Sequence, residues 1–347
     1  MDKLSPIFIR DQFELCDVPV PKGYPQSQTH VGVSQRNGKV YLTSSPFPEL
    51  RQSKFVAYAK AIIRKCTHGM LFKIVRAESY ENPLLYVSTN EHGSCFMLMQ
   101  SKPLMEQPDP IFGYPAFNSD PDIFIEGGKA YILNRAIFRT KLTPGRFRDE
   151  YCIRVYLIEG SLDGNRFNLN GINLINESDK LSVSPCLVKY QEKYRYFELF
   201  TNCYNDGNSF DGLKYKTFDT IDQLKTKDAQ WKTVCINEYE YLPWHMSVFE
   251  YDGKLYSVLA CVKKGEPKYC YQLLGEFSST LDKLTIYNKP LTDYNSYRGH
   301  AYVDDNGFFH LYTTTVREKL HNGKSVDGRE ILTASMNFED LLKQVRQ

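Results

Sequence analysis

The 347-residue sequence lacks the features that mark several large classes of protein. No stretch approaches the roughly 20 consecutive apolar residues needed to cross a bilayer, so we expect no membrane partner. The N-terminal segment has no apolar core followed by a cleavage site, which predicts a protein made in the cytoplasm without a signal peptide. The formal net charge is only +2, which gives no reason to expect nucleic acid as a partner.

Paired cysteines are also missing. The nine cysteines are scattered, odd in number, and none of them forms a CxxC motif. Their spacing therefore predicts neither a zinc site nor a disulfide framework, and we expect mostly reduced thiols packed as small apolar residues. No local motif indicates a cofactor, so the expected cofactor and metal content is none.

A short phrase that recurs five times dominates what is present. It consists of a polar anchor, a run of about seven residues, a tight turn of Gly type and a second strand, which is the pattern of a half-buried β-hairpin. Aromatic residues make up 14% of the chain, and this also favours strands. The copies read THVGVSQRNGKVYL from Thr29, SDPDIFIEGGKAYIL from Ser119, VSPCLVKYQEKYRYF from Val183, WHMSVFEYDGKLYSV from Trp244 and RGHAYVDDNGFFHLY from Arg298.

A hairpin of this size cannot bury its own apolar face, so the copies must stack against one another. The sequence therefore predicts an all-β fold, a five-bladed β-propeller that forms a single domain over residues 1–347, with blade starts near residues 30, 120, 184, 245 and 299. The Ala- and Lys-rich segment Glu49–Val75 predicts a short helical insertion in blade one. The last residues, NFEDLLKQVRQ, predict a short C-terminal helix that begins at Asn337 or Phe338.

The anchor residues are the candidate functional residues, because the first strand of every blade lines the central channel. The residue eight places before each turn is His30, Asp120, Ser184, His245 or Gly299. Asp120, His245 and His30 are the candidate catalytic groups, and the candidate substrate-binding residues are Arg135, Ser184, Trp244, Arg298, His300, Asp122 and Glu81.

Each candidate also has a structural explanation. Asp120-Pro121 can be a turn-initiating pair, the imidazoles of His30 and His245 can be satisfied half-buried groups, and Glu81 opens an outer hairpin. His30, Asp120, His245 and His300 could converge on one cation, as imidazole and carboxylate ligands do, but no local spacing supports it. An axial Ca²⁺ or Na⁺ bound by oxygen atoms is a further alternative.

The repeat resembles the five-bladed propeller glycosidases, the group of arabinanases, xylosidases and invertases. The resemblance is carried by SDPDIFIEGGKAYIL, SPCLVKYQEKYRYF and GHAYVDDNGFFHLY. It implies an Asp in blade one as base or nucleophile, a second Asp in blade two, and a Glu in blade three as general acid. Only the blade-two residue has a match, Asp120, because His30 and Ser184 stand at the other two places. Whether the chain is an enzyme stays open; if it is, Asp120 would be the base or nucleophile and His245 or His30 the proton donor.

The order of the phrases is also similar to propeller modules of bacteriophage tail and virion proteins and of gut-bacterial polysaccharide proteins. Three hypotheses follow. The chain is a glycosidase-like propeller that binds or hydrolyses a bacterial surface or dietary glycan in its central funnel, with an oligosaccharide as its partner. Alternatively it is a non-enzymatic phage virion or tail component, structural or receptor-binding, with a vestigial site and virion proteins as partners. The third reading is an intracellular glycosidase or phosphorylase that acts on imported oligosaccharides.

Overall fold

The computed structural model describes residues 5–25, 27–47, 59, 62–63, 66, 80–112, 116–141, 150–226, 228–237, 240–315 and 329–347. Strands account for most of them, which confirms the predicted all-β class. The predicted helical insertion at residues 49–75 lies almost entirely outside the described residues.

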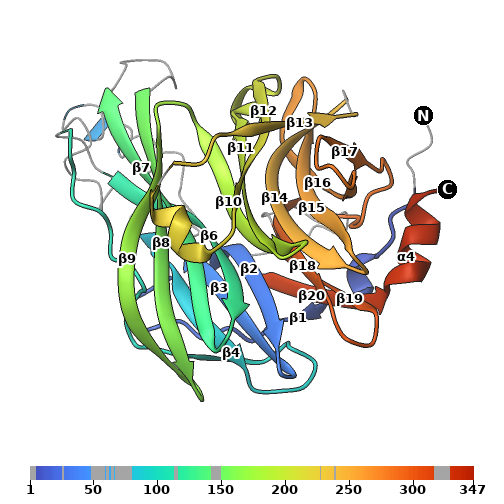
Figure 1. The fold of residues 1–347 in the computed structure, drawn as a ribbon, viewed down its shortest axis with the longest axis horizontal. Coiled ribbons are helices and arrows are strands. Elements are labelled where there is room, and N and C mark those ends of the chain that lie inside the picture. Colours follow the sequence, from blue (N-terminus) through green and yellow to red (C-terminus); the bar gives the residue numbers. More distant parts are fainter. Residues whose placement is uncertain are drawn as a thin grey trace.

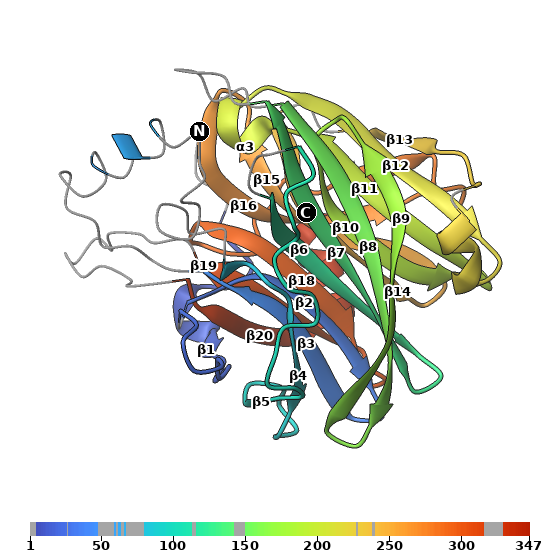
Figure 2. The same ribbon diagram turned by 90° about the vertical axis from the view of Figure 1, so that its left-hand side faces the viewer.

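The strands form antiparallel sheets in which neighbours along the chain are mostly neighbours in space (Figure 1). One sheet contains β2 (Gln28–Arg36), β3 (Lys39–Pro46), β4 (Leu84–Ser88) and β5 (Phe96–Leu98). The next contains β6 (Ala116–Glu126), β7 (Lys129–Lys141), β8 (Glu150–Asp163) and β9 (Arg166–Ser178), which are the long strands that run through the middle of Figure 2.

An eight-stranded sheet follows. Its first run is β10 (Ser182–Tyr190), β11 (Lys193–Thr201), β12 (Phe210–Phe218) and β13 (Lys232–Ile236). Its second run is β14 (Tyr241–Tyr251), β15 (Lys254–Lys263), β16 (Glu266–Phe277) and β17 (Lys283–Ile286). The two runs join where β13 pairs in parallel with β17.

The last sheet joins the two ends of the chain. It contains β18 (Ser296–Val303), β19 (Phe308–Thr315), β20 (Ile331–Asn337) and the N-terminal β1 (Glu14–Leu15), which pairs with β20. Short helices accompany the sheets: η1 (Arg10–Gln12), α3 (Cys203–Asp206), η3 (Ile221–Thr226) and α4 (Phe338–Val345).

Strands β2, β6, β10, β14 and β18 form a closed ring around the centre. Each lies beside the next, and β18 returns to β2, as their places in Figure 1 also show. These are the first strands of the five predicted hairpins, and the arrangement is propeller-like. Apolar side chains from neighbouring hairpins pack between the sheets; for example, Leu42 of β3 and Tyr312 of β19 share one buried cluster.

Every one of the five hairpins contains a break in register near its anchor. The pairing shifts between Thr29 and Gly32 in β2 and between Ser119 and Asp122 in β6. Equivalent shifts occur in β10, β14 and β18. A β-bulge leaves residues unpaired and turns their side chains in a new direction. The bulges therefore explain how the anchors of β2, β6 and β10 leave the regular alternation of their strands, whereas the bulges of β14 and β18 leave Trp244 and Tyr297 unpaired.

The C-terminal helix α4 is confirmed at the predicted place. The Asn337 side chain caps it by accepting a hydrogen bond from the backbone N–H of Asp340. Phe338 packs its ring against Phe249 and Phe309, which anchors the helix to the neighbouring hairpin. No helix among the described residues is long and apolar enough to span a membrane.

Candidate functional site

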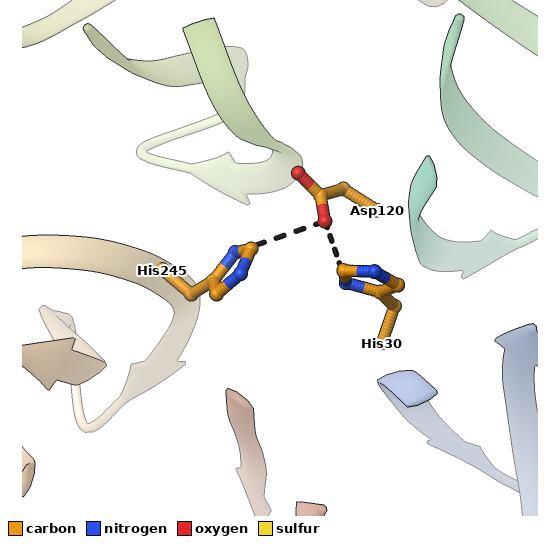
Figure 3. A group of neighbouring side chains, drawn as sticks. All are labelled: His30, Asp120 and His245. Carbon is orange, nitrogen blue, oxygen red and sulfur yellow. Dashed lines mark ion pairs between the residues drawn. The ribbon is translucent and has the colours of Figure 1, made fainter. Parts of the chain in front are cut away.

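Asp120 lies at the centre of a buried cluster on the propeller axis. Its Oδ1 atom is 2.6 Å from His30 Nδ1 and 3.8 Å from His245 Nδ1, as Figure 3 shows. Its Oδ2 atom is 2.9 Å from Arg135 Nη2. The three partners come from β2, β14 and β7, so the ring of strands brings together groups that are up to 215 positions apart in the chain.

The backbone at this cluster is held in an unusual conformation. His30, Asp120 and Ser184 have φ angles of +56°, +51° and +50°, in the left-handed region that residues with a side chain rarely adopt. Such strain persists only where the surrounding structure imposes it, and it concentrates at functional sites. Three corresponding bulges thus share the same strained geometry and aim their side chains at one point.

The surroundings keep Asp120 ionised. Its complete burial by itself raises the pKa of the carboxyl, but the charge of Arg135 and the neighbouring imidazoles of His245 and His30 outweigh that effect. The net pKa of Asp120 lies well below its ordinary value. The Ser184 backbone N–H also donates to Oδ2 over 3.3 Å. Asp120 is therefore a carboxylate at neutral pH.

His245 is a neutral imidazole. Burial lowers its pKa well below the ordinary value; the Asp120 charge opposes this, whereas His30, Arg298 and Arg135 lower the pKa further. Ser184 Oγ lies 2.7 Å from His245 Nδ1 and holds the ring orientation. His245 Nε2 has no hydrogen-bond partner among the described residues.

Glu81 contacts the opposite edge of His30. Its Oε2 atom is 3.1 Å from His30 Nε2, and its side chain is buried. Because a carboxylate only accepts, His30 Nε2 carries the proton. His30 Nδ1 faces Asp120 Oδ1 at 2.6 Å. This contact is favourable when a proton or a cation lies against Nδ1, which is the state in which His30 lowers the pKa of Asp120.

Aromatic rings cover the two imidazoles. The Tyr297 ring packs edge-on against His30 at 5.3 Å and His245 at 4.9 Å, measured between ring centroids. Trp244 contacts His245 and stacks on Tyr204 at 5.2 Å. The Arg329 guanidinium lies 4.4 Å from the Tyr297 ring centroid. Tyr297 and Tyr204 keep part of their surface exposed.

The remaining candidates, from β6 and β18, form a second group. His300 Nε2 is 2.8 Å from Asp122 Oδ1, and Arg298 Nη2 is 3.7 Å from the same oxygen. All three side chains are buried. The structure thus places the sequence-derived candidates in two adjoining layers, with His30, Asp120, Glu81, Arg135, Ser184, Trp244 and His245 in the first.

Sequence reasoning missed Tyr297, Tyr204, Arg329 and Ser119, whose hydroxyl lies within hydrogen-bond distance of His30 and Arg135. The sequence did contain a signal for Tyr297, because it directly precedes Arg298 just as Trp244 directly precedes His245. The bulges of β14 and β18 leave these two aromatic residues unpaired. The other three had no pattern to mark them.

The donor set fits a metal ion. His30, Asp120 and His245 each offer one ligand atom, these atoms lie within 4.8 Å of one another, and all three residues are buried. Two imidazoles and a carboxylate are ligands of catalytic zinc and of non-haem iron. The contact of Glu81 with the far nitrogen of His30 matches the way an outer carboxylate orients a ligating histidine. His300 is not in this set, since it is bound to Asp122.

The chain is similar in fold to several solved structures of carbohydrate enzymes. The chain aligns with an N-acetylgalactosamine deacetylase from F. plautii, in complex with blood group B trisaccharide, at a TM-score of 0.61 and 13% identity, covering 96% of this chain and 94% of that one. It also aligns with a GH43 β-xylosidase/α-arabinofuranosidase from a compost microbial metagenome, in complex with xylotriose (TM-score 0.56, 13% identity, 92% and 93% covered).

The chain has the fold of a glycosidase-type propeller. A third similar structure, xylan β-1,4-xylosidase from Bacillus halodurans, gives a TM-score of 0.57 at 13% identity, with 91% of this chain and 54% of the xylosidase covered. No family model and no curated protein matches the sequence. At this identity the likeness concerns the fold, and the propeller resemblance predicted from the repeat is confirmed at that level. The bacteriophage virion alternative has no support from these comparisons.

Proposed function

We propose that this chain is a carbohydrate-active, five-bladed propeller that holds a divalent cation with His30, Asp120 and His245 and hydrolyses an acyl group of a glycan. In this proposal, the runs β10–β13 and β14–β17 of the eight-stranded sheet are two separate blades. The main support for the proposal is the His30–Asp120–His245 cluster. It joins an ionised carboxylate to two imidazoles in a buried place where three ring strands meet.

A cation bound there would supply Lewis-acid chemistry, polarising an acyl oxygen and making water a stronger nucleophile at neutral pH. The protein residues position the ligands. Arg135 holds the Asp120 carboxylate, and it also donates to the Ser182 carbonyl oxygen over 2.7 Å. Glu81 fixes the proton of His30 on Nε2, which leaves the Nδ1 lone pair directed at the cluster.

The arrangement of carboxylates argues against ordinary glycoside hydrolysis. Two carboxyl groups must flank the scissile bond, roughly 5–10 Å apart, with the sugar between them. Among the described residues, the two carboxylates that contact the cluster are Asp120 and Glu81, and the His30 ring lies between them. A glycosidic bond cannot occupy that position.

An N-acetyl group is the acyl group that the comparisons favour. The aligned F. plautii protein is an N-acetylgalactosamine deacetylase, and its architecture matches nearly the whole of this chain. The partly exposed rings of Tyr297 and Tyr204 lie next to the two imidazoles and the Trp244 ring. Aromatic surfaces with a few convergent polar groups are typical of ligand sites, and here they would hold the sugar ring.

The test is acetate release, followed by proton NMR, from the methyl glycosides of N-acetylgalactosamine and N-acetylglucosamine. The chelator-treated protein is assayed before and after loading with Zn²⁺, Mn²⁺ or Co²⁺. We expect acetate only after loading. Release of xylose from xylotriose without acetate release from either glycoside would overturn the proposal in favour of a glycosidase.

Variants identify the site in the same assay. Asp120→Asn and His245→Gln are expected to abolish acetate release, while the exposed controls Asp211→Asn and His92→Gln retain it. Equal activity in Asp120→Asn and the wild type would show that the reaction takes place elsewhere.

A further inference from the structure

Arg298 is a completely buried cation whose side-chain donors have no hydrogen-bond partner in the described part of the chain. It comes from β18, and its side chain has no exposed surface. None of its three guanidinium nitrogens has a hydrogen-bond partner among the described residues. The nearby carboxylate oxygen, Asp122 Oδ1, is 3.7 Å from Nη2, which is too long for a hydrogen bond.

This situation is energetically unfavourable. A guanidinium carries five N–H donors and cannot lose its charge in a protein. Burying a charged group requires that its donors be matched by acceptors, because the water that it gives up is otherwise not replaced. Arg298 therefore needs a hydrogen-bond acceptor, and none of the described residues provides one.

Other unused polar atoms lie on the same part of the axis. Ser247 follows His245 by two positions in β14, so it lies on the same face of the strand, and its Oγ has no partner among the described residues. His300 has the same relation to Arg298 in β18. Its Nε2 bonds Asp122, while its Nδ1 is unpartnered in the described part of the chain.

The position of Arg298 on the axis is supported by the strands around it. β18 lies beside β14 and β2 in the closed ring, and Arg298 Nη2 reaches to within 3.7 Å of Asp122 Oδ1 on β6. Packing at this level is tight, since a Cβ atom added at Gly32 would lie 2.9 Å from Thr43 Cγ2. A small ligand is therefore favoured over a large one.

The charge balance favours an anion, and this step rests on the proposed function. With a divalent cation in the cluster, the positive charges of the cation, Arg135 and Arg298 exceed those of Asp120, Asp122 and Glu81 by one. Excess charge in a buried region of low dielectric is costly.

We propose that one monovalent inorganic anion of the chloride class binds on the axis against Arg298, next to the His30–Asp120–His245 cluster, and that it strengthens cation binding. The unused donors of Arg298 and Ser247 are its ligands. Since linkage between two binding equilibria is reciprocal, the cation strengthens anion binding by the same factor.

The direct test is crystallography with bromide in place of chloride. The wild-type protein is crystallised from sodium bromide, once loaded with Zn²⁺ and once treated with chelator, and anomalous data are collected at the bromine edge. We expect a bromide peak within hydrogen-bond distance of the Arg298 guanidinium in the loaded crystals. A feature there without anomalous signal is water and would overturn the proposal.

The two states separate this inference from the proposed function. Bromide at Arg298 in crystals that never take up zinc would uphold the anion site and refute the metal site. Zinc at the cluster without bromide at Arg298 would uphold the metal site and refute the anion site.

The coupling is measured in solution. The dissociation constant for Zn²⁺ is determined in sodium chloride and in sodium gluconate at equal ionic strength, and we expect chloride to tighten it by about 5- to 150-fold, the usual range for coupled sites. In Arg298→Met this chloride effect disappears, while the exposed control Arg166→Gln retains it. Equal constants in the two salts for the wild type would refute the coupling. If Arg298→Met does not fold, the wild-type bromide map still decides whether the anion binds.

Discussion

Asp120 Oδ1 and His30 Nδ1 lie 2.6 Å apart, although the two residues belong to different sheets and are 90 positions apart in the chain. Both have a left-handed backbone conformation within a bulge of an innermost strand. The contact is therefore built by two strained hairpins that meet at the axis. The contact is chemically significant because Asp120 is held ionised in this buried place and His30 is oriented by Glu81.

The close approach of β2 and β6 that allows this contact depends on Gly32. A Cβ atom at this position would lie 2.9 Å from Thr43 Cγ2, 3.2 Å from the Asp122 Cα and 3.2 Å from the Pro121 carbonyl oxygen. We expect Gly32→Ala to lower the free energy of unfolding by about 1–3 kcal/mol, the usual cost of overpacking, and to weaken Zn²⁺ binding by separating His30 from Asp120.

Urea denaturation and a zinc titration measure both effects. Gly171→Ala in β9 is the matched control, because a Cβ atom there meets only Asn173 Nδ2 at 3.6 Å. A Gly32→Ala protein as stable as the control variant would show that the strands are not held this tightly.

Asp120 also neutralises Arg135 inside the protein. Asp120→Asn leaves that guanidinium buried without its charge partner, and breaking a buried pair from one side typically costs about 3–5 kcal/mol. We expect a loss of this size in chemical denaturation at pH 7. The exposed control Asp211→Asn should change the free energy of unfolding by less than about 0.5 kcal/mol. A loss no larger than that of the control would contradict the proposed role of the pair.

Glu81 provides a test of the orientation of His30. Replacing it with Gln keeps its shape but removes its charge, so the His30 ring becomes a weaker ligand. Changes of this kind typically reduce metal affinity by about 10- to 100-fold. Competition with a chelator measures the affinity of Glu81→Gln against that of the exposed control Glu91→Gln. Unchanged affinity would mean that Glu81 has only a structural role.

A second buried carboxylate, Glu198 of β11, predicts a pH dependence of stability. Burial raises its pKa above the ordinary value, although hydrogen bonds from Tyr196 and Asn176 oppose the rise. The unfolded chain therefore releases this proton at lower pH than the folded chain, and wild-type stability from this group is lost as the pH rises through the folded pKa.

Replacing Glu198 with Gln removes the ionisable group, and with it this loss of stability at higher pH. We expect the free energy of unfolding of the variant, relative to the wild type, to increase as the pH is raised from about 4.3, the ordinary Glu value, towards neutrality. Denaturation curves across that range measure it. A difference that stays constant with pH would refute the assignment.

The local elements could be predicted from sequence, and the assembly of the site only in part. Alternating apolar residues before turns such as Asn37-Gly38 define each hairpin within about 15 residues, so the five innermost strands and their polar anchors were accessible. The helix at Phe338 was marked by its Asn337 cap in the same local way. His30, Asp120, Ser184 and His245 were thus identified before any contact between them was known.

The long-range parts had no local signal. The contact of Glu81 with His30 joins a residue before β4 to one in β2, and nothing in the repeat relates them. The parallel pairing of β13 with β17 likewise joins two strands across a whole antiparallel run. From the sequence, His300 could not be distinguished from the three residues that fit a metal ion. Only three-dimensional packing shows that His300 bonds Asp122 instead.

The most direct test of the account is an anomalous difference map at the zinc edge from crystals of the wild-type protein equilibrated with Zn²⁺. We expect one strong peak bonded to His30, Asp120 and His245, at the distances of about 2.0–2.2 Å that zinc makes to nitrogen and carboxylate oxygen. The peak should be absent from Asp120→Asn crystals. A wild-type map with no zinc at this cluster, and His30 held by a second proton between Asp120 and Glu81, would contradict it.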